Sequence, residues 1–104
     1  MDASEVIAER RLIFVRPNGT EVASSIQFCR PYFKDDFGVL CDMEIPGIEK
    51  RRWSGGVDGV QAILLAMSLA ASILDAKAEK GWRFLWPDTR EETSAKEIFG
   101  SLCS

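Results

Sequence analysis

The sequence predicts an α+β fold in which an antiparallel meander of about five strands carries one long helix on one face (β-β-β-β-α-β). Short segments of alternating apolar and polar residues, separated by turn residues, indicate four strands in the first half of the chain. A long helical pattern covers 58–80, and an aromatic strand-like segment, 82–86, follows it. With 104 residues, the chain suits a single domain, 1–104, with its core at about 7–87 and a tail at 88–104.

The first two strands are expected to form a hairpin. Residues 9–16 are rich in β-forming types, and Pro17-Asn18-Gly19 follows them. Proline suits the first central position of a type I turn, and Gly19 can adopt the positive φ that closes a three-residue hairpin loop. The second strand is predicted at 20–30, and the apolar residues that share one of its faces are Val22, Ile26 and Phe28.

Two further strands are predicted at 37–45 and 49–54, joined by a turn at Pro46-Gly47. Residues 32–36 are expected to be the loop that precedes them. In the strand 37–45 the inward residues are Val39, Cys41, Met43 and Ile45, and the outward residues are Leu40, Asp42 and Glu44. The cations at 50–52 are charges that an edge strand uses against unwanted pairing.

The helix has recognisable ends. Asp58 is the expected N-cap, Gln61 occupies the capping-box position, and Gly81 stands just beyond the last turn. A helix of about 22 residues is roughly 33 Å long, which is enough to cross the sheet and return the chain for strand 82–86. That strand lies antiparallel beside the first strand or, by a right-handed crossover, parallel beside the fourth. The tail can form one short helix at about 94–102.

The helix carries apolar residues on two opposite faces, and a helix that lies on a sheet needs only one. One stripe consists of Val60, Ile63, Leu64, Met67, Ala71, Leu74 and Ala78, and the other of Ala62, Leu65, Ala66, Leu69, Ile73 and Ala76. The second stripe predicts a further partner, either a second protomer or the chain's own tail. A homodimer is favoured because the tail is short, whereas a second copy can cover the whole stripe. The residues assigned to this interface are Leu65, Leu69, Ile73, Ile98, Phe99 and Leu102.

Composition and charge argue against several classes of protein. The net charge of -3 disfavours nucleic acid as the main ligand, because phosphate binding requires clustered positive charge. The uncharged run 59–74 is shorter than the roughly 20 apolar residues of a membrane span. The first residues include acids and no apolar signal-peptide core. We therefore expect a cytoplasmic protein that binds neither nucleic acid nor membrane.

Two polar clusters suggest chemistry but have simpler explanations. Ser54-Gly55-Gly56 precedes a helix, but the lysine of a phosphate-binding loop is missing and Asp58 would repel phosphate. Asp42 and Glu44, with Asp35-Asp36 before them, could hold Mg²⁺, but a solvated strand face explains them better. The chain has no histidine, and its three cysteines lack metal-ligand spacing. We predict no catalytic residue, no metal and no cofactor.

The remaining candidates are a cysteine pair, a cationic segment and a set of aromatic residues. Cys29 and Cys41 fall on opposite faces of neighbouring strands, so a disulfide between them is not expected. The cations at 50–52 stand next to Trp53 and could contact nucleic acid by charge and stacking, although an edge strand explains them too. The aromatic residues that could line a ligand pocket are Trp53, Trp82, Phe84 and Trp86.

Two motifs mark the start of the helix and the last strand: Gly56-Val57-Asp58-Gly59-Val60-Gln61-Ala62 and Gly81-Trp82-Arg83-Phe84-Leu85-Trp86-Pro87. Glu9-Arg10, the turn 17–20 and Arg30-Pro31-Tyr32 add to them. In these motifs the chain resembles a family of small bacterial proteins with a domain of unknown function. The resemblance covers about 7–87 and implies a bacterial origin, with no activity to carry over.

These observations predict a non-enzymatic protein-interaction module or accessory subunit, homodimeric through the second apolar face of helix 58–80. The prediction depends on that face and on the lack of a nucleophile–base arrangement. The alternative is a small-ligand-binding protein or an enzyme that uses an aromatic-lined cleft between helix and sheet.

Overall fold

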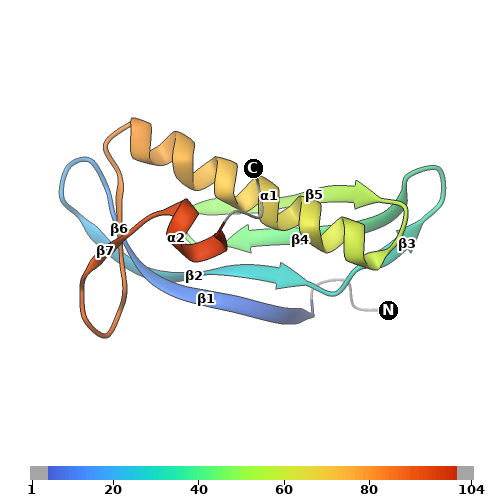
Figure 1. The fold of residues 1–104 in the computed structure, drawn as a ribbon, viewed down its shortest axis with the longest axis horizontal. Coiled ribbons are helices and arrows are strands. Elements are labelled where there is room, and N and C mark those ends of the chain that lie inside the picture. The colour runs from blue at the N-terminus through green and yellow to red at the C-terminus, as the bar shows by residue number, and fades with distance from the viewer. Residues whose placement is uncertain (1–4, 101–104) are drawn as a thin grey trace.

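The computed structural model describes residues 5–100 and shows a twisted antiparallel sheet with helices on one face (Figure 1). Within these residues the sheet has seven strands: β1 (Val6–Val15), β2 (Glu21–Cys29), β3 (Tyr32–Lys34), β4 (Gly38–Ile45), β5 (Glu49–Gly56), β6 (Arg83–Leu85) and β7 (Glu92–Thr93). The helices are α1 (Gly59–Glu79) and α2 (Ala95–Phe99). The predicted α+β class, with one long helix and a short C-terminal helix, is confirmed.

The last predicted strand, β6, pairs antiparallel with β1, so the parallel position beside the fourth predicted strand is excluded. Across the sheet the strands follow the order β5, β4, β2, β1, β6, β7. β3 pairs with the first part of β4, on the same edge of β4 as β2, which pairs with its last part. β3 lies in the segment 32–36 that was expected to be a loop, and β7 lies in the tail. Both were missed because pairing with a neighbouring strand, rather than a local pattern, makes these short segments extended.

The β1–β2 hairpin closes through the predicted turn. Gly19 has a φ of 91°, which confirms its positive φ. The Gly19 N–H donates to the Arg16 carbonyl over 2.8 Å, and the Arg16 N–H donates to the Thr20 carbonyl over 2.8 Å. This is the hydrogen-bond pattern of a three-residue loop closed by a glycine bulge.

Both ends of α1 follow the sequence signals. The Asp58 carboxylate accepts from the Gln61 N–H at 2.9 Å, while the Gln61 side chain accepts from the Val57 N–H at 2.7 Å. The reciprocal cap therefore reaches one residue further back than in a standard capping box. At the other end, the Gly81 and Trp82 N–H groups donate to the Ala78 and Lys77 carbonyls, which is a Schellman motif.

The core lies between the sheet and α1, which crosses β4 and β5. The inward side chains of the strands that build it include Leu12, Phe14, Ile26, Phe28, Cys41, Met43 and Ile45. On the helix side, Ala62, Ala66 and Ala70 are fully buried. Small side chains allow a close approach here, since a Cβ on Gly56 would lie only 2.8 Å from the Ala62 nitrogen.

The buried face of α1 combines residues of both predicted stripes, so the division into a sheet-facing and a free stripe does not hold. Ala62 and Ala66 of one stripe are buried, and so are Ala71 and Leu74 of the other. By length and mean hydropathy (1.7 over its most apolar window) α1 could cross a membrane, a test that core helices also pass. Here its alanine face packs on the sheet.

Candidate interaction surfaces

The outer face of α1 exposes apolar side chains near its N-terminal end. Val60 is 69% exposed, Leu64 and Leu65 are each 43% exposed, and Val57, just before the helix, is 83% exposed. No charged residue occurs from Gly59 to Leu74. A solvated helix face normally carries charged residues, and depletion of charge is typical of the centre of protein interfaces.

The residues assigned to an interface from the sequence fall into two places. Leu65 is exposed, whereas Leu69 and Ile73 are half-buried and pack against the core. Phe99 of α2 packs edge-on against Phe28, with ring centroids 6.4 Å apart. Leu102 lies outside the described residues.

The tail covers one flank of α1. Ile98 and Phe99 line a groove together with Met67. Met67 and Leu65 are about 200° apart around the helix axis. The described part of the tail therefore does not cover Leu65, which stays open to solvent.

The groove has a volume of about 250 Å³ and opens between β1, β2 and the two helices. Its residues are Ala8, Glu9, Arg10, Phe28, Met67, Ile98 and Phe99. A wider hollow of about 760 Å³ adjoins it, between β1 and the segment 86–91. Arg10 borders both spaces, and its guanidinium lies 5.2 Å from the centre of the Trp86 ring.

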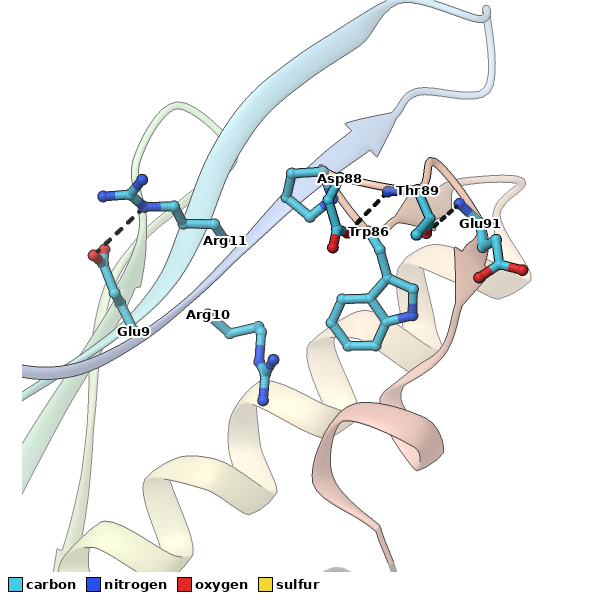
Figure 2. Close-up of a pocket in the computed structure, with 8 residues that line it drawn as sticks. Glu9, Arg10, Arg11, Trp86, Asp88, Thr89 and Glu91 are labelled. Carbon is cyan, nitrogen blue, oxygen red and sulfur yellow. Dashed lines mark hydrogen bonds and ion pairs between the residues drawn. The ribbon is translucent and has the colours of Figure 1, made fainter.

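Figure 2 shows how the side chains of the hollow are divided between the two faces of the sheet. Arg10 and Trp86 point to the side of the helices, whereas Glu9 and Arg11 point to the opposite side and lie 3.8 Å apart. The loop after Trp86 is braced by its own hydrogen bonds, from the Thr89 N–H to Asp88 and from the Glu91 N–H to Thr89 (Figure 2). The hollow therefore has a defined wall.

The aromatic residues expected to line one pocket are dispersed. Phe84 is in the core, edge-on to Phe14 at 5.8 Å. Trp82 lies under the Lys77 ammonium at 4.6 Å, and Trp53 is on the opposite face of the sheet. The groove takes its aromatic rings from Phe28 and Phe99 instead, which the sequence showed as apolar residues but did not show to be neighbours.

Asp42 is not on a solvated strand face, and that prediction was wrong. The residue is only 7% exposed. The Tyr32 hydroxyl donates to Asp42 Oδ1 at 3.2 Å, and Arg51 Nη1 lies 3.4 Å from Oδ2. Arg51 also donates to Glu44 at 3.0 Å. Asp42 is buried because β3, expected to be a loop, places Tyr32 over it.

Burial, and then the negative charge of Asp42, raise the pKa of Tyr32 above its ordinary value of 10.0. The hydrogen bond to Glu44 raises the pKa of Arg51. Burial is also the main reason that the pKa of Cys41 rises to about 11, with Cys29 and Asp42 adding to it. The Cys41 thiol, which donates to the Cys29 carbonyl, is therefore neutral at physiological pH and a poor nucleophile.

The other candidate sites are accounted for by local contacts. Arg51 pairs with Asp42 and Glu44, and Arg52 pairs with Glu49 at 2.7 Å, so these two cations already have anionic partners. Cys29 and Cys41 are buried, and no disulfide joins them. Between residues 5 and 100, no group of three His, Cys, Asp or Glu side chains is arranged to hold a metal ion.

Comparison with known proteins places the chain in a family. A family model described as "Domain of unknown function (DUF6968)" matches residues 8–95, which include the whole sheet from Ala8 onward, α1 and the first residue of α2. No curated protein and no solved structure matches the chain. The protein therefore belongs to the DUF6968 family, a domain of unknown function.

Proposed function

We propose that the protein is a non-enzymatic interaction module that forms a homodimer through the exposed face of α1. The observation that carries the proposal is the uncharged, partly apolar surface centred on Val60, Leu64 and Leu65. Leu69 and Ile73 border this surface, and each is already half-covered by the core.

The energetic reason is the apolar area left in water. A fully exposed Leu or Val side chain gains about 1.5–3 kcal/mol on burial. Since Leu64 and Leu65 are each 43% exposed, covering them contributes on the order of 1 kcal/mol apiece. Two copies of the surface contribute twice this amount, because each protomer covers the other.

A second copy suits this surface better than an unrelated partner. An isologous contact brings identical surfaces together, so a charged surface would meet its own charge across the two-fold axis. The segment Gly59 to Leu74 carries no charge and avoids this repulsion. Ser68 and Ser72 lie beside Leu64 and Leu65 on the outer side of the helix, and such small side chains let two helices approach closely.

The oligomeric state tests the proposal. Light scattering after size exclusion should give the wild-type protein the mass of a dimer, and Leu65→Lys should give a folded monomer because a charge then lies at the centre of the contact. Ala78→Lys is the matched control, since it adds the same charge to an exposed position of the same helix outside the proposed surface. A monomeric wild type at high micromolar concentration would refute the proposal.

A second candidate function is binding of a small apolar ligand in the groove between α1, α2 and the sheet. Its support is the lining by Phe28 and Phe99 with Arg10 at the rim. Ligand binding is only the second candidate function, because the groove's volume of about 250 Å³ is below the roughly 300–1,000 Å³ of typical ligand pockets. A thermal-shift screen with small apolar carboxylic acids tests it, and Met67→Trp should abolish any stabilisation by filling the groove.

The cytoplasmic location, and the absence of nucleic-acid and membrane partners, stay predictions from composition.

A further inference from the structure

The first half of β1 has an open edge. β2 pairs with β1 from Val6 to Val15, whereas β6 pairs only with Ile13–Val15. In the described part of the chain, no other strand pairs with residues 6–12. The β6 ladder cannot continue along β1 because Pro87, just beyond it, has no N–H to donate.

The hydrogen bonds of the hairpin define which backbone groups face this edge. Arg16 uses both its N–H and its carbonyl across the turn toward β2. Bonding direction alternates along an antiparallel strand, and the register is regular from Ala8 to Val15. From Ala8 onward the even-numbered residues of β1 therefore bond to β2, and Glu9 and Arg11 direct their N–H and carbonyl groups to the open edge.

The wider hollow and the groove both lie along this edge, the groove on the side of the helices. The groove of about 250 Å³ reaches β1 at Ala8 and Arg10, and the wider hollow lies between Arg10 and the loop after Trp86. A strand added beside β1 would direct every second side chain to this side. Of three successive inward side chains of that strand, the first would enter the groove and the second would face Arg10. The third would reach the wider hollow beside Trp86.

The lining determines which side chains would fit. The groove is apolar because Phe28, Met67 and Phe99 line it. Arg10 takes part in none of the ion pairs among residues 5–100, and its neighbour is the Trp86 ring. An acidic side chain facing Arg10, with a large apolar one two residues away, complements this surface.

A second copy of β1 does not complement this edge. A symmetric antiparallel pairing that uses the regular part of the strand is centred on Glu9 or on Arg10. The first register sets Glu9 opposite Glu9 of the second copy and Arg10 opposite Ala8. The second register sets Glu9 opposite Arg11 but also sets the two Arg10 side chains opposite each other. Like charges directly opposite are destabilising, and neither register supplies an acidic side chain that faces Arg10.

We propose that the open edge of β1 binds an extended peptide segment of another protein by strand addition. The bound segment carries an acidic residue that faces Arg10 and, two residues away, a large apolar residue that enters the groove. The charges of Glu9, Arg10 and Arg11 protect the edge from unselective pairing and admit a strand of complementary charge. This site is separate from the proposed dimer surface on α1, so either can fail without the other.

The probe is a capped, fluorescein-labelled heptapeptide, Thr-Phe-Thr-Glu-Thr-Phe-Thr, whose inward pattern is the same in parallel and antiparallel orientation. Fluorescence anisotropy should show saturable binding to the wild-type protein. Replacing the central Glu by Lys, or N-methylating the peptide backbone, should weaken binding at least tenfold. Arg10→Gln should remove most of the preference for Glu over Lys. Lys50→Gln is the matched control, since it removes one positive charge from an exposed position of β5, a strand that does not pair with β1, and it should change binding less than twofold.

Amide hydrogen exchange gives a second readout that requires no protein variant. The peptide should slow exchange at Glu9 and Arg11, while Arg10 and Leu12, already bonded to β2, should change little. No binding up to millimolar peptide, equal binding of the Glu and Lys peptides, or protection elsewhere than at this edge would overturn the proposal. It would also be overturned if the protein alone protected Glu9 and Arg11 in a concentration-dependent way, which would assign the edge to a second copy.

Discussion

Replacing Asp42 by asparagine should lower the pKa of Tyr32 toward 10.0, its ordinary value. Burial is the main cause of the raised pKa, followed by the charge of Asp42 and its hydrogen bond with the Tyr32 hydroxyl. Asparagine removes the charge but keeps an oxygen that can accept from the hydroxyl. The pKa should therefore fall but remain above 10.0, because burial is unchanged.

The contacts of Asp42 also determine how much stability the change removes. A hydrogen bond to a charged group contributes about 1.5–3 kcal/mol, and the half-buried Tyr32 places this bond near the lower value. The Arg51 side chain is 40% exposed and lies 3.4 Å from the carboxylate, so this pair adds about 0–1 kcal/mol. Asp42→Ala should thus cost about 2 kcal/mol, and Asp42→Asn about 1 kcal/mol or less.

The assay is a spectrophotometric titration of tyrosinate, which is specific because Tyr32 is the single tyrosine of the chain. Denaturant unfolding at several pH values gives the linked change in stability. Since the folded pKa is above that of the unfolded chain, the unfolded chain ionises first. The free energy of unfolding should therefore fall as pH rises from 10.0 through the folded pKa. Asp42→Asn should narrow this pH range, because it lowers the folded pKa of Tyr32.

Three results would refute this account of Asp42. A wild-type midpoint at or below 10.0 would show that Tyr32 is neither buried nor close to a negative charge. Equal midpoints in wild type and Asp42→Asn would show that burial alone acts and that the contact between the two side chains is absent. Asp42→Ala with wild-type stability would lead to the same conclusion.

Three further predictions concern the helix cap, the hairpin turn and a buried thiol. Asp58→Ala should lower the free energy of unfolding by about 0.5–2 kcal/mol through loss of the bond from the Gln61 N–H, and an unchanged denaturation midpoint would contradict the cap. Gly19→Val should cost about 1 kcal/mol or more in thermal or chemical unfolding, because a β-branched residue is strained at the φ of 91° found there; wild-type stability would mean that the turn has another conformation. Because the pKa of Cys41 is raised from 9.0 to about 11, the free energy of unfolding should fall by about 2–3 kcal/mol as pH rises from 9 to about 11. Cys41→Ala should not show this fall. Parallel pH profiles for the two proteins would count against a buried neutral thiol.

Features governed by neighbouring residues were predictable. The turn at Gly19, the cap at Asp58 and the inward face of β4 depend on backbone sterics, on one side chain near a helix end and on the period of a strand. The short strands β3 and β7 were not predictable, since their extended form depends on a partner strand. The missed burial of Asp42 followed from the missed β3, because a loop at Tyr32 would have left the carboxylate in water.

The sequence by itself determined the longer elements and the inward faces of the longer strands, since these follow from residues that are close together in the chain. It also determined that α1 carries more apolar surface than a sheet-covered helix needs. Only the tertiary structure decided that both stripes share in the buried face, that Phe99 packs against Phe28, and that residues 5–100 leave an edge of β1 open beside Arg10. Each of these depends on contacts between residues far apart in the chain, and the same local patterns are compatible with several such arrangements.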